Sequence, residues 1–271
     1  MQIAAAVLVA CFVWWAATGA ILYVVKRADA GLGSYRAPVF WTAPAAVLGA
    51  GVLWWSTLAP GAAPGTAQVY GGFFGAVGRW GGFELAFLAG VITGPNRFEC
   101  PRGIPEFERF VRAWGTIAYS EMALAAIALA CLALLREAES TIGLWTFLVL
   151  FFARISAKLN VWMGVPNINV EFLPRPVAHV ASHFRVAPMN PLFPATQLAL
   201  ALAMGFWIER AATAQGSDAV GFTLLAVLTA LAFLEHWMMV LPLQDAKLWA
   251  WLIRFRQVPH DKAKGAAADG L

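Results

Sequence analysis

The chain alternates between apolar runs of about twenty residues and short stretches that contain Gly, Pro or charged residues. A helix needs about twenty apolar residues to cross a bilayer, because it rises about 1.5 Å per residue and the hydrocarbon core is about 30 Å thick. The pattern therefore predicts an all-α, polytopic membrane helix bundle with about seven transmembrane helices. The predicted spans cover residues 3–25, 39–58, 71–93, 116–135, 142–163, 193–210 and 219–241.

The third predicted span and the C-terminal segment differ in composition from the other apolar runs. The range 71–93 is rich in glycine and contains Arg79 and Glu84, which favours close packing against neighbouring helices through small residues. We expect residues 1–245 to form one transmembrane bundle, since no soluble segment interrupts the runs. Residues 246–271 begin with interleaved tryptophan and basic residues, which predicts an amphipathic helix on the membrane surface followed by a disordered tail.

The positive charges predict the orientation of the bundle. Sixteen of the 19 Lys and Arg residues lie after the first, third and seventh predicted spans or in the stretch from the end of the fifth span to the sixth, whereas the alternate loops carry only Arg136 and Arg210. Cytoplasmic loops of membrane proteins are enriched in Lys and Arg. The alternation therefore predicts an N-terminus outside and a C-terminus in the cytoplasm, and the chain is expected in a bacterial inner membrane, cytoplasmic or intracytoplasmic.

The composition excludes several classes of protein. Hydrophobic residues make up 61% of the chain and charged residues 13%, against about 25% charged in soluble domains. The lipid bilayer is thus the expected surrounding, and no nucleic-acid partner is expected, because the basic residues are scattered. Three cysteines give neither a disulfide framework nor a CxxC motif. The seventh span has no lysine, which excludes a retinal protein.

Ionisable groups inside the predicted spans are the first functional candidates, because a charge at the bilayer centre is costly. Glu84, Glu121, Glu235 and His236 are expected at one depth, near the cytoplasmic ends of their helices. Further polar candidates lie on the fifth span and in the loop that follows it: Arg154, Lys158, Asn160, Asn167, Glu171, His179 and His183.

These groups allow three interpretations. The first is a site for iron, manganese or zinc, for which His and carboxylate side chains are suitable ligands. His179 and His183 would share a face if a helix starts after Pro176, but Val180 stands where an HExxH zinc motif needs Glu. The expected ligand set is Glu84, Glu121, His179, His183, Glu235 and His236.

The second interpretation is structural: Glu84 and Glu121 pair with Arg154, Lys158 or Arg79 and hold the bundle together. The third makes an imidazole the axial ligand to the magnesium of a chlorophyll-type pigment, since neutral imidazole is a good metal ligand. The candidates for this role are His179, His183 and His236.

Three stretches and one Pro-rich segment resemble a known family. They are Gly94-Pro95-Asn96-Arg97 with Cys100-Pro101; Arg154-Ile155-Ser156-Ala157-Lys158-Leu159-Asn160, Gly164-Val165-Pro166-Asn167 and Glu171-Phe172-Leu173-Pro174; Glu235-His236-Trp237 with Val240-Leu241-Pro242-Leu243; and Pro188-Met189-Asn190-Pro191-Leu192-Phe193-Pro194. The chain thus resembles the PuhE-type photosynthetic complex assembly proteins of purple phototrophic bacteria.

The resemblance implies a membrane factor for assembly of the photosynthetic reaction centre and light-harvesting apparatus, or for regulation of the bacteriochlorophyll supply to it. The implied partners are reaction-centre or antenna subunits or pigment-synthesis proteins. The resemblance implies no particular chemical reaction, so we expect the protein to bind its partners and not to catalyse a reaction. The alternative is an intramembrane oxidoreductase with one or two metal ions, acting on a tetrapyrrole or an isoprenoid.

Overall fold

The computed structural model describes residues 1–40, 65–135, 138 and 140–242, and in these ranges the protein is helical, with one isolated bridge between Val165 and Val186. The expected all-α class is therefore confirmed for this part of the chain. The α-helices are α1 (Gln2–Asp29), α3 (Thr66–Leu88), α4 (Glu106–Leu135), α5 (Ile142–Met163), α6 (Leu192–Thr213) and α7 (Gly216–Met238). Two 3₁₀ helices, η1 (Val170–Phe172) and η2 (Arg175–His183), follow α5.

Five of these helices are long and apolar enough to cross a membrane: α1, α4, α5, α6 and α7. The predicted range 142–163 has the same bounds as α5, and the ranges 3–25, 193–210 and 219–241 overlap α1, α6 and α7 almost completely. The predicted span 39–58 and the surface helix and tail at 246–271 lie largely or wholly outside the described residues.

Helix α3 is displaced by five residues from the predicted range 71–93, and it is not among the five apolar helices. Its end is set by Gly90, which takes φ +73° after the last helical turn. The Gly90 and Val91 N–H groups donate to the Phe87 and Ala86 carbonyls, which is a Schellman motif. The apolar residues Val91 and Ile92 that follow are consequently not helical.

Helix α4 begins at Glu106, ten residues before the predicted range 116–135. Glu106 and Glu108 lie in its first turn, where carboxylates interact favourably with the helix dipole. Both also form ion pairs one turn along the helix, with Arg109 and Arg112. Polar residues thus extend this helix beyond its apolar stretch, which a search for hydrophobic runs could not detect.

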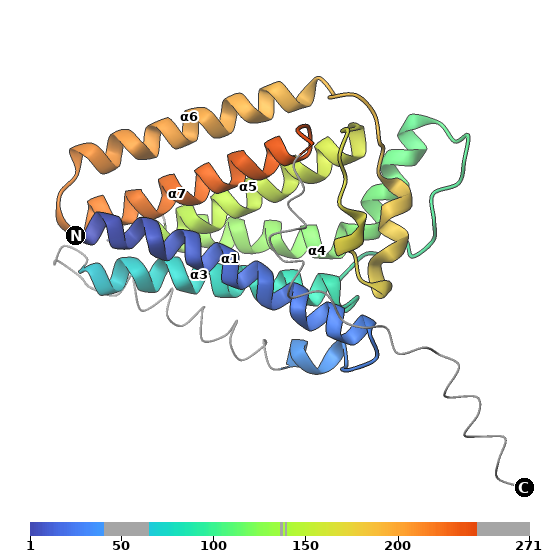
Figure 1. Ribbon diagram of the computed structural model, residues 1–271, viewed down its shortest axis with the longest axis horizontal. Coiled ribbons are helices and arrows are strands. Elements are labelled where there is room, and N and C mark those ends of the chain that lie inside the picture. The colour runs from blue at the N-terminus through green and yellow to red at the C-terminus, as the bar shows by residue number, and fades with distance from the viewer. Residues whose placement is uncertain (41–64, 136–137, 139, 243–271) are drawn as a thin grey trace, which may run out of the picture.

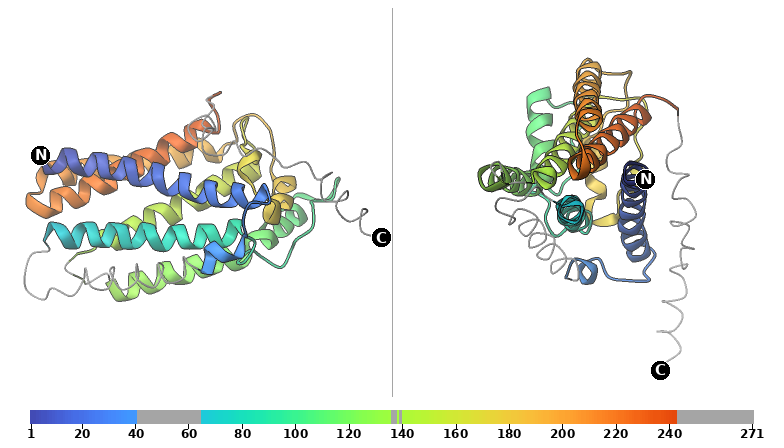
Figure 2. Two further views of the ribbon diagram at one scale, coloured as in Figure 1. Left: turned by 60° about the horizontal axis from the view of Figure 1, so that its bottom comes forward. Right: turned by 90° about the vertical axis from the view of Figure 1, so that its left-hand side faces the viewer.

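The helices form one elongated bundle in which α1, α3, α5 and α7 run in one direction and α4 and α6 in the other (Figure 1). Helix α7 is the most central of the five apolar helices: 56% of its most apolar stretch is buried, against 22–33% for the others. The largest core cluster joins Val220, Leu224 and Leu225 of α7 to residues of α1, α3, α5 and α6. Figure 2 shows the same bundle from its side and from one end.

Loops and 3₁₀ helices cover the end of the bundle at which α1, α3, α5 and α7 finish; we call it the loop end. Asp29, the last residue of α1, accepts hydrogen bonds from the Tyr35 hydroxyl and from the Arg175 N–H of η2. Burial and the hydrogen bond to Asp29 raise the pKa of Tyr35. The Cys100 N–H donates to the Ser182 hydroxyl of η2 (2.8 Å). Side-chain and backbone hydrogen bonds therefore tie segments far apart in sequence into one layer.

Candidate functional site

Arg154 on α5 is the centre of a buried group of charges. Its Nε donates to Glu121 Oε1 on α4 (3.0 Å), and Nη1 forms an ion pair with Glu84 on α3. Lys158, one turn further along α5, donates from Nζ to the same Glu121 oxygen (2.5 Å). We call Glu84, Glu121, Arg154 and Lys158 the charge cluster. The predicted pairing of both glutamates with Arg154, and of Glu121 with Lys158, is confirmed by these contacts.

The charge cluster lies largely inside the bundle. The side chains of Arg154 and Glu121 are only 8% and 3% exposed, whereas Lys158 and Glu84 are 26% and 27% exposed. The Phe87 ring lies against both cations, 5.1 Å from the Arg154 guanidinium carbon and 4.6 Å from Lys158 Nζ. Because Arg154 and Glu121 are almost completely buried, their charges depend on their ionic partners in place of water.

His236 on α7 lies near this cluster but is engaged elsewhere. Its Nδ1 is 2.8 Å from the Ala232 carbonyl, which can only accept, so Nδ1 must carry the proton. Its Nε2 is 2.8 Å from the Ser156 hydroxyl of α5, which also donates to the Ala153 carbonyl (3.0 Å). Nε2 thus joins α7 to α5, Nδ1 is held by a carbonyl one turn earlier on α7, and a metal could bind Nε2 only by displacing Ser156.

His179 and His183 lie apart from the charge cluster, on η2 at the loop end. A 3₁₀ helix has three residues per turn, so residues four apart do not lie directly above one another, and Val177 interrupts the helix. The expected shared helical face is therefore not formed. Burial lowers the pKa of both imidazoles, which favours their neutral form. The Nε2 atom of each is buried without a hydrogen-bond partner among the described residues.

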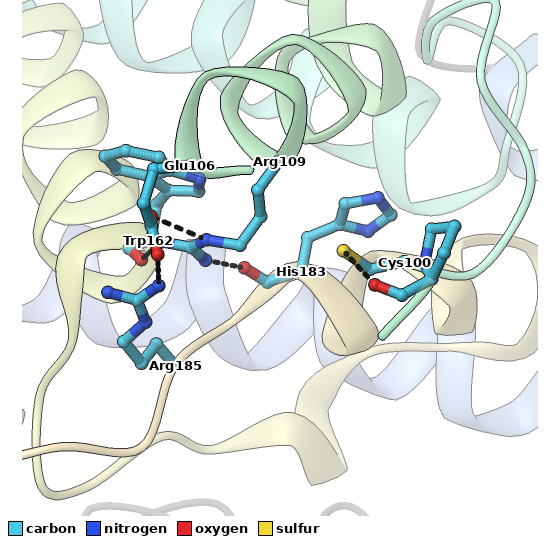
Figure 3. A network of polar contacts seen from close by, with 7 residues as sticks. Cys100, Glu106, Arg109, Trp162, His183 and Arg185 are labelled. Atoms are coloured by element: carbon cyan, nitrogen blue, oxygen red, sulfur yellow. Dashed lines mark hydrogen bonds and ion pairs between the residues drawn. The ribbon is translucent and has the colours of Figure 1, made fainter. Parts of the chain in front are cut away.

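Arg109 holds the backbone around this histidine segment in place (Figure 3). Its guanidinium donates to the Trp162 carbonyl at the end of α5 (2.8 Å) and to the His183 carbonyl (3.2 Å). It also lies 4.4 Å from the Trp162 ring centroid. Glu106 pairs with both Arg109 and Arg185. In the sequence Arg109 is one of several basic residues in a predicted loop, and no local pattern predicts that it binds the backbone of two other segments.

Two of the three remaining polar candidates have structural contacts. Asn160 is fully buried and donates from Nδ2 to the Ser156 carbonyl (2.9 Å) and to the Thr196 hydroxyl of α6 (3.2 Å). The Asn167 side chain donates to the Leu241 carbonyl after α7 (2.7 Å). Glu171 lies exposed on η1. Asn160 and Asn167 therefore stabilise connections between helices.

Asn190 has a similar role that sequence reasoning missed. Its Nδ2 donates to the Asn160 and Gly164 carbonyls, and its Oδ1 accepts from the Leu192 and Phe193 N–H groups. It thereby caps the start of α6 and joins it to the end of α5. An asparagine just before an apolar run is the signal that would have predicted the cap.

A cavity of about 530 Å³ lies between α1, α3, α5 and α7 and is bordered at the loop end by Phe172 and Leu173. Glu84, Arg154, Lys158, Glu235 and His236 contribute its polar wall, and the rest of the lining is mainly apolar. The Trp14 indole of α1 donates to Glu235 Oε1 of α7 across the cavity wall (2.7 Å). The structure thus places Glu84, Glu235 and His236 around one space, together with two cations.

The predicted metal-ligand set does not converge. Within the ranges that the structure describes, no three His, Cys, Asp or Glu side chains are arranged so that they could hold a metal ion. The six candidates separate into Glu84 and Glu121 in the charge cluster, Glu235 and His236 on α7, and His179 and His183 on η2.

Comparison with known proteins identifies a family and a relative of the chain. The family described as "Protein of unknown function (DUF3623)" matches residues 1–260. A chain from Rhodobacter capsulatus, described as an uncharacterized 30.4 kDa protein in the puhA 5′ region, is 50% identical over 244 residues, which cover 89% of this chain and 88% of the relative. No solved structure matches the chain.

Proposed function

The chain belongs to the DUF3623 family, and from that premise we propose that it is an integral membrane factor of photosynthesis. In this proposal it serves the assembly of reaction-centre and light-harvesting complexes, or regulates the supply of bacteriochlorophyll to them. The observation that carries the proposal is the 50% identity with a relative encoded in the 5′ region of puhA, a photosynthesis gene region. The motifs that resemble PuhE-type proteins support the same role.

The outward faces of two helices support a role in which helices meet other helices or lipid. Helix α4 exposes aromatic and aliphatic side chains along its length, and α6 exposes a second apolar face. These residues include Trp114, Tyr119, Met122 and Leu129 on α4, and Leu198, Leu202, Phe206 and Ile208 on α6. In a bilayer such faces pack equally well against lipid tails or client helices, which permits transient binding.

The proposed topology has seven spans in residues 1–245, with α3 and the range 39–58 added to the five apolar helices, and a surface segment at 246–271. The N-terminus lies outside and the loop end faces the cytoplasm. The distribution of Lys and Arg supports this orientation. The expected site is the cytoplasmic or intracytoplasmic membrane, where reaction-centre or antenna subunits and pigment-synthesis proteins would be the partners.

Gene deletion in a phototrophic host tests the proposed role. We expect the deletion strain to contain less reaction centre or antenna per cell, measured by the near-infrared absorbance of its membranes and by immunoblots of the subunits. The wild-type gene supplied on a plasmid should restore the complexes, and puhA transcript levels should be unchanged in the deletion strain. Normal amounts of both complexes and of bacteriochlorophyll would contradict the proposal.

A further inference from the structure

The cavity between α1, α3, α5 and α7 has the size and chemistry of a site for a small lipid-soluble molecule. Its volume of about 530 Å³ lies within the range of about 300–1,000 Å³ that is usual for small-molecule sites. Small side chains such as Ala17, Ala153 and Ala157 leave this space open between the helices. Most of its lining is apolar, so the body of the molecule must be apolar as well.

One end of the cavity offers hydrogen-bond donors for which the described residues show no acceptor. Lys158 Nζ carries three N–H bonds, of which one goes to Glu121. The Phe87 ring covers part of the ammonium, and the side chain also lines the cavity. A ligand with an acceptor oxygen at this end would give the Lys158 ammonium a second hydrogen-bond partner.

The charges around the cavity indicate that the ligand is uncharged. Arg154 and Lys158 are balanced by Glu84 and Glu121, and Glu235 adds a further carboxylate to the wall. An anionic head group would therefore add to a surplus of carboxylates, and a cationic one would be repelled by Lys158 and Arg154 at the end where it must bind; both are costly at low dielectric. A carbonyl oxygen accepts from Lys158 without adding a charge.

Two tryptophans indicate the shape of the ligand. Trp14 and Trp80 both line the cavity, and the hydrogen bond from Trp14 to Glu235 restrains the orientation of that indole. Flat aromatic walls bind a planar ring by offset stacking or edge-to-face contact. An apolar ring compound fits such walls better than a fatty-acid chain.

We propose that this cavity binds an uncharged, bilayer-soluble ring compound, and that a carbonyl oxygen of the ring accepts a hydrogen bond from Lys158 while the ring contacts Trp14 and Trp80. The site goes beyond the assembly role, because it rests on the cavity alone and a binding measurement does not depend on the deletion phenotype. A prenylated quinone and a pigment macrocycle with a ring ketone both have this chemistry.

Binding is tested on the purified full-length protein in nanodiscs with decylubiquinone as the probe. Quinones quench tryptophan fluorescence, so we expect saturable quenching by the wild-type chain. Ala153→Phe, which fills the cavity, and Lys158→Met, which removes the donor, should each weaken binding at least tenfold. Ala126→Phe, the same enlargement at an exposed position of α4, should bind like the wild type. Dodecanoate, an anion with a similar tail, should not compete.

Mass spectrometry of organic extracts distinguishes the natural sources. Recovery of a prenylated quinone or of a macrocyclic pigment with the wild type, but not with Ala153→Phe, supports the site and identifies its ligand. Non-saturable quenching, equal binding by the wild type, Ala153→Phe and Lys158→Met, or equal competition by dodecanoate would overturn the inference. A normal deletion phenotype would contradict the assembly role and leave these binding results unchanged.

Discussion

At the scale of single residues, Glu121 is the most deeply buried carboxylate in the part of the chain that the structure describes. It is 3% exposed and its Oε1 accepts from both Arg154 and Lys158, so one carboxylate pairs with two cations of a neighbouring helix, of which Arg154 also pairs with Glu84. Its Oε2 has no hydrogen-bond partner among the described residues. Removing one member of a buried ion pair leaves the other charge uncompensated, which is usually far more damaging than the loss of an exposed pair.

We therefore expect Glu121→Gln to lower the free energy of unfolding by about 3 kcal/mol or more. The substitution leaves Arg154 with Glu84 but deprives Lys158 of its anion. Thermal or denaturant unfolding in detergent, followed by circular dichroism, measures the change. Glu108→Gln is the matched control, since its pair with Arg112 is about 40% exposed on both sides and should contribute about 0.5 kcal/mol. Equal losses in the two variants would contradict the argument.

At the scale of elements, the segment after α3 is attached directly to the backbone of α4. The Ser120 N–H donates to the Thr93 carbonyl and the Asn96 N–H to the Gly115 carbonyl, both at 3.0 Å. The Asn96 side chain donates to the Arg112 carbonyl (2.9 Å). The Gly94-Pro95-Asn96 motif therefore has a structural explanation: it fastens the end of α3 to the middle of α4.

This attachment requires glycine at position 94. A Cβ there would lie 2.8 Å from the Thr116 carbonyl carbon and closer still to the Gly115 carbonyl oxygen, both of which belong to rigid helix backbone. We expect Gly94→Ala to destabilise the fold by about 1–3 kcal/mol, the usual effect of overpacking. Gly205→Ala on α6, where nothing lies within 4 Å, should be neutral or slightly stabilising. Unfolding curves with unchanged midpoints for Gly94→Ala would show that the segment can move away.

At the scale of the whole molecule, the proposed orientation in the membrane can be tested by measuring from which side each end of the bundle is accessible. The loop after α3 belongs to the loop end, whereas the turn between α6 and α7 lies at the opposite end of the bundle (Figure 1). The proposed orientation places the first on the cytoplasmic side and the second outside. Both loops offer exposed polar residues, Glu99 and Gln215, at which a cysteine can be introduced.

In a chain whose three native cysteines are replaced by serine, we expect an impermeant maleimide to label Gln215→Cys in intact spheroplasts. Glu99→Cys should be labelled only in inverted membrane vesicles. Each variant is the control for the other, because both are made in the same cysteine-free chain and differ only in the end of the bundle at which the cysteine lies. Labelling from the reverse sides would overturn the orientation that the basic loops indicate.

The secondary structure was largely predictable, because transmembrane helices leave a local signature of length and apolarity. The range 142–163 matches α5, and four other predicted ranges overlap apolar helices. The helix boundaries that were predicted wrongly depend on charge–dipole interactions and on backbone conformation, which length and apolarity do not reveal. Helix α4 starts early because Glu106 and Glu108 stabilise its first turn, and α3 stops early because Gly90 adopts a left-handed conformation.

The residues by themselves determined that lipid-compatible helices would form, that Glu84, Glu121, Arg154 and Lys158 were candidates to lie within them, and that the two acids would need cationic partners. The tertiary structure decided which partners meet. In the folded chain Glu121 pairs with two cations, and both ring nitrogens of His236 have hydrogen-bond partners. His179 and His183 lie on η2, outside the charge cluster. The cavity also arises only from packing, because its walls come from four helices. Helical periodicity is a local property, whereas these distances depend on how each helix is rotated against its neighbours.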